Sequence, residues 1–173
     1  MNQTFPRRLA WALLLLILVS QSAAAPQTKP PEGIRQHFLG TWRLVVFENI
    51  SKDGKVSYPY MGRHAVGYLM YAPDGHMCAG LMNPDRPKWS ETRTPTDKEK
   101  IQLFDTFYAY CGRFEIREAE HLMIHYPELA ATPDFVGSTQ PRPYSFDGER
   151  LTFSGPETNP PGSTYRITWE KVK

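Results

Sequence analysis

The sequence predicts an all-β fold: an eight-stranded antiparallel up-and-down barrel with one short helix at its rim. Short segments rich in aromatic and β-branched residues follow one another along the chain, as is typical of strands. The links between these segments alternate between tight turns and long loops, so an antiparallel meander places all tight turns at one end. Eight strands can close on themselves and so remove the free edges of the sheet. The predicted shape is a cup with a narrow end and a mouth rimmed by loops.

Eight strands are expected, in the order of the chain. They cover residues 41–49, 66–72, 76–82, 107–117, 121–127, 140–146, 149–154 and 164–171. Two of the tight links, Pro73-Asp-Gly75 and Asp147-Gly148, are hairpin signals, because glycine supplies the positive φ that such turns need. The third tight link is Glu118-Ala-Glu120. The remaining links are long and are expected at the mouth.

The one predicted helix covers residues 96–105, between the third and fourth strands. Thr96 and Glu99 are spaced as a capping box, in which each side chain hydrogen-bonds the backbone of the other residue. Ile101 and Phe104 follow at helical spacing. This helix is therefore expected on the rim of the barrel.

The first 24 residues are predicted to be a secretory signal peptide. The pair Arg7-Arg8 precedes an apolar run over residues 9–19, and small residues follow at Ser22-Ala23-Ala24. This is the order of a signal peptide, with cleavage expected before Ala25. The alternative is a membrane anchor, but the apolar run is shorter than the roughly 20 residues of a spanning helix. The protein is therefore expected to be secreted or periplasmic.

The mature chain is predicted to be one domain preceded by a short tether. Residues 25–36 form a proline-rich leader, of which residues 26–33 are expected to be an extended tether, and residues 37–173 form the barrel domain. The full chain has 20 basic and 18 acidic residues, but Arg7 and Arg8 leave with the signal peptide. The mature chain is then formally neutral, which argues against nucleic acid or an anionic membrane surface as the main partner. No stable membrane insertion is expected after signal removal, and the oligomeric state is left open.

Alternation along the strands predicts which side chains point into the barrel. The apolar ones form a floor toward the narrow end: Trp42, Ile116, Phe146 and Leu151. The polar ones lie mostly toward the mouth and are the predicted ligand-binding residues: Glu48, Tyr110, His125, Arg142 and Tyr144. His125 points inward if the link after Ile116 has two residues, whereas a three-residue link would reverse its face. The alternative is a barrel filled by its own side chains, with Glu48 and Arg142 as an ion pair at its edge.

Sequence signals for a metal, a cofactor or a catalytic nucleophile are missing, and none of these is predicted. The five histidines form no metal-binding motif, and the two cysteines are not spaced as Cys-x-x-Cys. No nucleophile elbow, phosphate-binding loop or dinucleotide fingerprint occurs. Cys111 could pair with His125 only inside the barrel, and alternation places Cys111 on the outer face.

The only two cysteines, Cys78 and Cys111, are expected to form a disulfide. Export would carry both of them to an oxidising compartment. The hairpin at Pro73-Asp-Gly75 places Cys78 on the outer face, where Cys111 also lies, and their strands should be neighbours. The alternative is two separate thiols, because local signals do not set the register across the long link between these strands.

Several segments of the chain resemble one known family. The first strand opens with Gly40-Thr-Trp42, and four further segments are Val66-Gly-Tyr-Leu-Met-Tyr-Ala-Pro-Asp-Gly75, Leu81-Met-Asn-Pro-Asp-Arg86, Tyr110-Cys-Gly-Arg-Phe-Glu115 and Phe135-Val-Gly137. In this order they are similar to the lipocalin-like domain family of bacteria and fungi, over about residues 37–171. The resemblance implies a calycin-type barrel of eight strands and is compatible with small-molecule binding.

The leading functional hypothesis is a secreted barrel that binds a small hydrophobic or amphipathic molecule in its central cavity. One alternative is an enzyme that uses the same cavity for acid–base chemistry, for example an isomerase, cyclase or hydratase. Another is a protein-interaction module that works through its rim loops. An apolar cavity with few ionisable groups favours binding, a pair of His125 and Glu48 with a shifted pKa favours catalysis, and a filled interior favours the interaction module.

Overall fold

The computed structural model describes residues 32–58, 61–91, 93–157 and 161–173, so the predicted signal peptide and most of the predicted leader lie outside it. The elements are, in chain order, α1 (Glu32–Phe38), β1 (Gly40–Ile50), β2 (Val56–Ser57), β3 (Val66–Tyr71), β4 (His76–Met82), α2 (Asp97–Asp105), β5 (Phe107–Arg117), the 3-10 turn η1 (Glu118–Glu120), β6 (Leu122–Ala130), the 3-10 turn η2 (Pro133–Phe135), β7 (Gln140–Asp147), β8 (Arg150–Glu157) and β9 (Ser163–Lys171). No helix in this part of the chain is long and apolar enough to cross a membrane.

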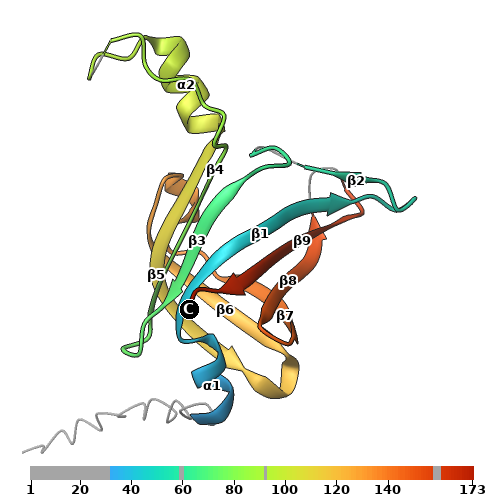
Figure 1. The fold of residues 1–173 in the computed structure, drawn as a ribbon. Coiled ribbons are helices and arrows are strands. Elements are labelled where there is room, and N and C mark those ends of the chain that lie inside the picture. Colours follow the sequence, from blue (N-terminus) through green and yellow to red (C-terminus); the bar gives the residue numbers. More distant parts are fainter. Residues whose placement is uncertain (1–31, 59–60, 92, 158–160) are drawn as a thin grey trace, which may run out of the picture.

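Eight of these strands form a closed antiparallel barrel (Figure 1). Neighbouring strands pair in the order β1-β3-β4-β5-β6-β7-β8-β9, and β9 pairs back with β1. The two-residue strand β2 pairs only with Asn49 and Ile50 at the end of β1. The predicted eight-stranded up-and-down barrel is confirmed. β6 and β8 extend further toward the mouth than predicted, to Ala130 and Glu157.

Helix α1 lies at the narrow end of the barrel, where the tight turns are (Figure 1). The fully buried ring of Phe38 packs edge-on against Tyr71, Tyr144 and Phe146, with ring centres 5.8, 4.9 and 5.0 Å away. Glu32 and Gly33, expected at the end of the extended tether, belong to this helix, so that expectation is wrong for these two residues. A helix of seven residues is not stable in isolation, so the packing of Phe38 into the barrel determines it.

Helix α2 stands beyond the mouth, at the tip of the link between β4 and β5 (Figure 1). The predicted capping box is present: the Thr96 hydroxyl accepts a 3.4 Å hydrogen bond from Glu99 N, and the Glu99 carboxylate accepts a 2.7 Å bond from Thr96 N. The backbone N–H groups of Ser90 and Thr96 lower the pKa of Glu99 to about 2. Ile101 and Phe104 are 62% and 56% exposed, so the helix is held by its cap and not by burial in the barrel.

Cys78 and Cys111 form a disulfide. β4 and β5 pair so that the two cysteines are directly opposite each other, and their Cα atoms are 4.1 Å apart. The predicted bridge is confirmed, and the alternative of two separate thiols is wrong. The register that joins them comes from the pairing of the two strands over their whole length, which no local signal in the intervening link encodes.

Candidate functional site

The narrow half of the barrel is packed with its own side chains. Large, fully buried ones fill it: Phe38, Trp42, Leu69, Tyr71, Met77, Met123 and Leu151. Of the predicted floor, Trp42, Ile116 and Leu151 are buried, and Phe146 packs partly buried against the same core. The floor is therefore apolar as predicted, but it is solid. A ligand inside the barrel would have to lie nearer the mouth.

His125 on β6 joins two tyrosines above this floor. The Tyr71 hydroxyl lies 2.6 Å from Nε2 of His125, and the Tyr110 hydroxyl lies 2.7 Å from its Nδ1. β5 and β6 pair Ile116 with Met123, which is the register that a two-residue link predicts. The side chain of His125 is therefore inside the barrel, as expected, and it is 2% exposed.

Burial keeps these three rings uncharged near neutral pH. It holds the pKa of His125 well below its usual value of 6.5, and the positive charge of Arg142 lowers it further. Burial likewise raises the pKa of Tyr71 and of Tyr110. A neutral imidazole has one N–H and one acceptor nitrogen, so one tyrosine donates to His125 and the other accepts from it. The three side chains form a continuous hydrogen-bonded chain.

Arg142 on β7 is a half-buried cation beside these tyrosines. Its guanidinium carbon lies 5.5 Å from the ring centre of Tyr165, and Nη2 donates a long, 3.5 Å hydrogen bond to Gln140 Oε1. Burial opposes its charge, but the phenol groups of Tyr110 and Tyr165 outweigh that effect and raise the pKa of Arg142. Among the described residues, no carboxylate forms an ion pair with it. Such a cation is unusual, because charges removed from water are normally paired.

Two buried polar residues are not predicted from the sequence: Asn49 on β1, and Tyr165 on β9, which lies beside Arg142. They are directly opposite each other and are 3% and 8% exposed. Asn49 Oδ1 and the Tyr165 hydroxyl are buried without a hydrogen-bond partner in the described part of the chain. Gly155 on β8 leaves room for the tyrosine ring, since a Cβ there would lie 3.0 Å from Tyr165 Cε1. We call Asn49, Tyr110, Arg142 and Tyr165 the mouth cluster.

Sequence alternation could have identified one of these two residues. Tyr165 has the same parity as the buried Trp169 in the last strand, so strand alternation places it inside. Asn49 has no such signal, because strict alternation from Trp42 places it on the outer face. A local irregularity in β1 reverses its direction.

Glu48 lies on the outer face of the barrel, so its predicted place in the cavity is wrong. A β-bulge between Leu44 and Val46 adds one residue to β1 and reverses the alternation beyond it. Glu48 is therefore opposite Arg166 on β9, whose Nε donates a 2.6 Å hydrogen bond to the Glu48 carboxylate. The alternative of an ion pair between Glu48 and Arg142 is wrong for the same reason.

Tyr144 is inside the barrel, as predicted, but at its narrow end and not at its mouth. Its ring packs 4.9 Å from Phe38 and 5.8 Å from Phe146, next to α1. Burial, together with the negative charge of Glu118, raises the pKa of Tyr144. Tyr144 therefore belongs to the floor and not to the mouth cluster.

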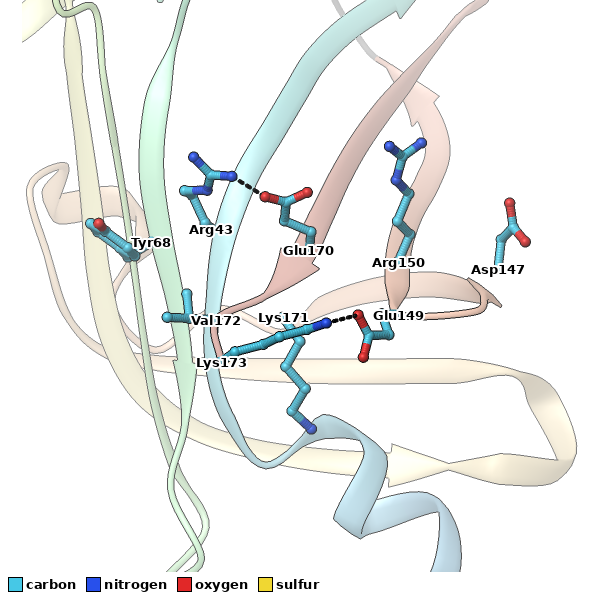
Figure 2. Close-up of a pocket in the computed structure, with 9 residues that line it drawn as sticks. All are labelled: Arg43, Tyr68, Asp147, Glu149, Arg150, Glu170, Lys171, Val172 and Lys173. Atoms are coloured by element: carbon cyan, nitrogen blue, oxygen red, sulfur yellow. Dashed lines mark hydrogen bonds and ion pairs between the residues drawn. The ribbon is translucent and has the colours of Figure 1, made fainter.

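A cleft of about 690 Å³ lies on the outside of the barrel (Figure 2). Its lining is mostly charged: Arg43, Tyr68, Asp147, Glu149, Arg150, Glu170, Lys171, Val172 and Lys173. Ion pairs join Arg43 to Glu170 and Lys173 to Glu149, as Figure 2 shows. Because acidic and basic groups compensate each other there and face solvent, this cleft is a weaker candidate for specific binding than the mouth cluster.

Fold and interior together define a class of protein: a closed antiparallel barrel with an apolar floor and a polar cluster below its mouth, an architecture that fits small-molecule binding. The chain belongs to the lipocalin-like domain family, whose family model matches residues 39–172. Among solved structures it is similar to the lipoprotein YedD from Klebsiella pneumoniae subsp. pneumoniae MGH 78578, at 13% identity and a TM-score of 0.39, over 83% of this chain and 74% of that one. No curated protein matches the chain. The family resemblance drawn from the sequence is confirmed.

Proposed function

We propose that the protein is an exported lipocalin-like barrel that binds a small amphipathic molecule with a carboxylate or phenolate head group. The observation that carries this proposal is Arg142, a half-buried cation that forms no ion pair among the described residues. Removing a charge from water costs free energy unless an opposite charge compensates it. An anionic head group would supply that charge and accept charge-assisted hydrogen bonds from the guanidinium.

The tyrosines beside Arg142 support the same proposal. Tyr110 and Tyr165 bring hydroxyl groups to the guanidinium, and the 2.7 Å hydrogen bond to His125 holds Tyr110 in place. Phe135 packs 5.0 Å from Tyr110 and 5.5 Å from Tyr108, which makes an aromatic surface next to the cation. The apolar part of a ligand would pack on this surface, gaining about 25 cal/mol for each Å² removed from water.

Export is part of the proposal and rests on the N-terminal sequence, since residues 1–31 lie outside the described residues. A signal peptide over residues 1–24 would deliver the chain to an oxidising compartment, which the disulfide between Cys78 and Cys111 fits. Protein recovered from the periplasm or the medium should begin at Ala25 when its N-terminus is sequenced. Intact Met1 on protein in the membrane fraction would contradict export with cleavage.

The head-group proposal is tested by titrating the protein with a fluorescent anthroyloxy fatty acid and with its methyl ester. The acid should bind more tightly than the uncharged ester, and Arg142→Leu should weaken binding of the acid about 10- to 100-fold while leaving the ester unchanged. Arg113→Leu is the matched control, because Arg113 is an exposed arginine of β5 that pairs with Glu128. Equal binding of acid and ester, or no effect of Arg142→Leu, would contradict the proposal.

One observation favours a second function, acid–base catalysis. The chain Tyr71–His125–Tyr110 ends beside Arg142, so a proton could pass from a bound molecule through Tyr110 to His125. The lowered pKa of His125 makes it a poor proton acceptor near neutral pH, and the raised pKa of both tyrosines makes them poor proton donors. Binding therefore remains the preferred function. Conversion of a bound ligand that is lost in His125→Gln would reverse that preference.

A further inference from the structure

We infer that the groove between α2 and residues 82–89 is a second binding site, for an amphiphile with an anionic oxygen head group. The groove lies outside the barrel, at the base of the helix that stands beyond the mouth (Figure 1). None of its lining residues belongs to the mouth cluster, so this inference does not depend on the proposed function.

The groove has the size and the mixed lining of a small-molecule site. Its volume is about 500 Å³, which is within the range of ligand pockets. Trp89 and Leu103 are 41% and 39% exposed, so a large part of both side chains is open to solvent. The apolar side of the lining is Met82, Pro84, Pro87, Trp89 and Leu103, and the polar side is Asn83, Arg86, Lys88, Glu99 and Gln102.

Arg86 has a guanidinium nitrogen without a partner. Its Nε donates a 3.2 Å hydrogen bond to the backbone oxygen of Asn83, and Nη2 lies 2.7 Å from Met82 Sδ. The guanidinium carbon is 5.6 Å from the centre of the Phe107 ring. Nη1 is buried and has no hydrogen-bond partner among the residues that the structure describes. Because arginine only donates, an acceptor on a ligand would satisfy Nη1.

The charge of the lining favours an anionic acceptor over a neutral one. Arg86 and Lys88 are both cationic, and no carboxylate within the described ranges forms an ion pair with Arg86. The acid in the lining, Glu99, accepts 2.7 Å hydrogen bonds from the backbone N–H groups of Ser90 and Thr96, which compensate its charge. A negatively charged oxygen would accept charge-assisted hydrogen bonds from Arg86.

The apolar side of the groove determines the rest of the ligand. Inorganic phosphate would satisfy Arg86 but would leave Trp89 and Leu103 in water. An apolar tail attached to the head group would cover both side chains, and burial of apolar surface favours binding. Since Arg86, Trp89 and Leu103 line the same groove, head group and tail can be bound together. The ligand is therefore an anionic amphiphile.

Tryptophan fluorescence tests this site selectively. Of the three tryptophans in the described part of the chain, Trp42 and Trp169 are 1% and 2% exposed, whereas Trp89 lines the groove. Octyl phosphate below its critical micelle concentration should shift the emission to shorter wavelength, and Trp89→Phe should abolish this shift. Octyl glucoside, which has the same tail and an uncharged head group, and inorganic phosphate should each bind at least about 10-fold more weakly.

Vesicles of phosphatidylglycerol present the same chemistry in a bilayer. A shift with vesicles as well would identify a membrane lipid as the source of the ligand. A shift with octyl phosphate alone would identify a dissolved amphiphile.

Two variants test the recognition of the head group. Arg86→Leu removes the unpartnered donor and should weaken binding of octyl phosphate about 10-fold or more, and Lys88→Met should weaken it about 3-fold. Lys88 is exposed, so its variant remains informative if Arg86→Leu disturbs the segment. Arg113→Leu and Lys98→Met are the matched controls, because both residues are exposed and lie outside the groove, and they should leave the affinity unchanged.

The inference is wrong if octyl phosphate causes no shift, or if the shift survives Trp89→Phe. Equal binding of octyl phosphate and octyl glucoside would overturn the anionic head group, and so would unchanged binding in both Arg86→Leu and Lys88→Met. A shift of the Trp89 emission that follows protein concentration without any amphiphile would assign the groove to a second copy of this chain and would also overturn the inference.

Discussion

The Tyr110 hydroxyl lies 2.7 Å from Nδ1 of His125, and both side chains are buried inside the barrel. With Tyr71 on the other ring nitrogen, His125 has both of its polar atoms occupied by neutral partners. Burial, together with the positive charge of Arg142, lowers the pKa of His125 and favours the uncharged imidazole in this site. The stability of the fold should therefore depend on pH, because His125 binds a proton more readily in the unfolded chain than in the folded protein.

Stability should fall as the pH drops below about 6.5. The pKa of His125 is depressed in the folded state and near 6.5 in the unfolded state, so only the unfolded chain takes up the proton in this range. The contribution of the neutral His125 to the unfolding free energy is fully present above the pKa that this residue has in the unfolded state. It is lost as the pH falls toward the pKa that this residue has in the folded state. Between pH 7 and pH 5 this residue should account for a loss of up to about 2 kcal/mol of unfolding free energy, the limit for a folded state that takes up no proton in this interval.

Urea unfolding at pH 7 and pH 5 checks this dependence, with His125→Gln as the control. Glutamine keeps a donor and an acceptor at this position but does not titrate, so the variant should lose less unfolding free energy than the wild type over the interval, by up to about 2 kcal/mol. Equal losses in the two proteins would show that His125 is not held neutral in the fold.

Phe38→Ala should destabilise the protein by about 3–5 kcal/mol. It removes the ring that joins α1 to the floor and leaves a cavity among Tyr71, Tyr144 and Phe146. Phe104→Ala is the control for deleting a phenyl ring, since Phe104 on α2 is 56% exposed and should change the unfolding free energy by less than about 0.5 kcal/mol. Similar urea midpoints for both variants would mean that α1 does not pack as described.

Glu48→Gln should lower stability without changing ligand binding. Glu48 is 9% exposed and its carboxylate pairs with Arg166 on the outer face, so losing the charge should cost about 1–3 kcal/mol. Glu170→Gln is the control, because the pair of Glu170 with Arg43 is more exposed and should contribute less than about 1 kcal/mol. Weaker binding of the anthroyloxy acid to Glu48→Gln would place Glu48 back in the cavity.

Gly155→Ala should weaken binding of the anionic probe and destabilise the fold by about 1–3 kcal/mol. The new Cβ would lie 3.0 Å from Tyr165 Cε1, so the ring has to move, and with it the surface on which Arg142 rests. Gly80→Ala is the matched control in β4, where nothing lies within 4 Å of an added Cβ. Unfolding and probe titration of both variants measure the difference, and equal behaviour would contradict the role given to Gly155.

The sequence by itself determined the features that local signals encode. The alternation of strands and turns, the hairpin at Pro73-Asp-Gly75 and the capping box of Thr96 and Glu99 each involve residues close together in the chain, and each is present in the structure. The inward direction of His125 follows from the short link between β5 and β6, which transmits the alternation from one strand to the next. The family resemblance rests on the same local segments.

Tertiary structure decided what depends on contacts between distant segments. The bulge between Leu44 and Val46 exists because β1 pairs with β9 at the other end of the chain, and it turns Glu48 out of the barrel and Asn49 into it. Helix α1 forms because Phe38 packs against rings from β3 and β7. A one-residue shift reverses every side chain beyond it, so the identity of the polar groups at the mouth could be known only once the strands were paired.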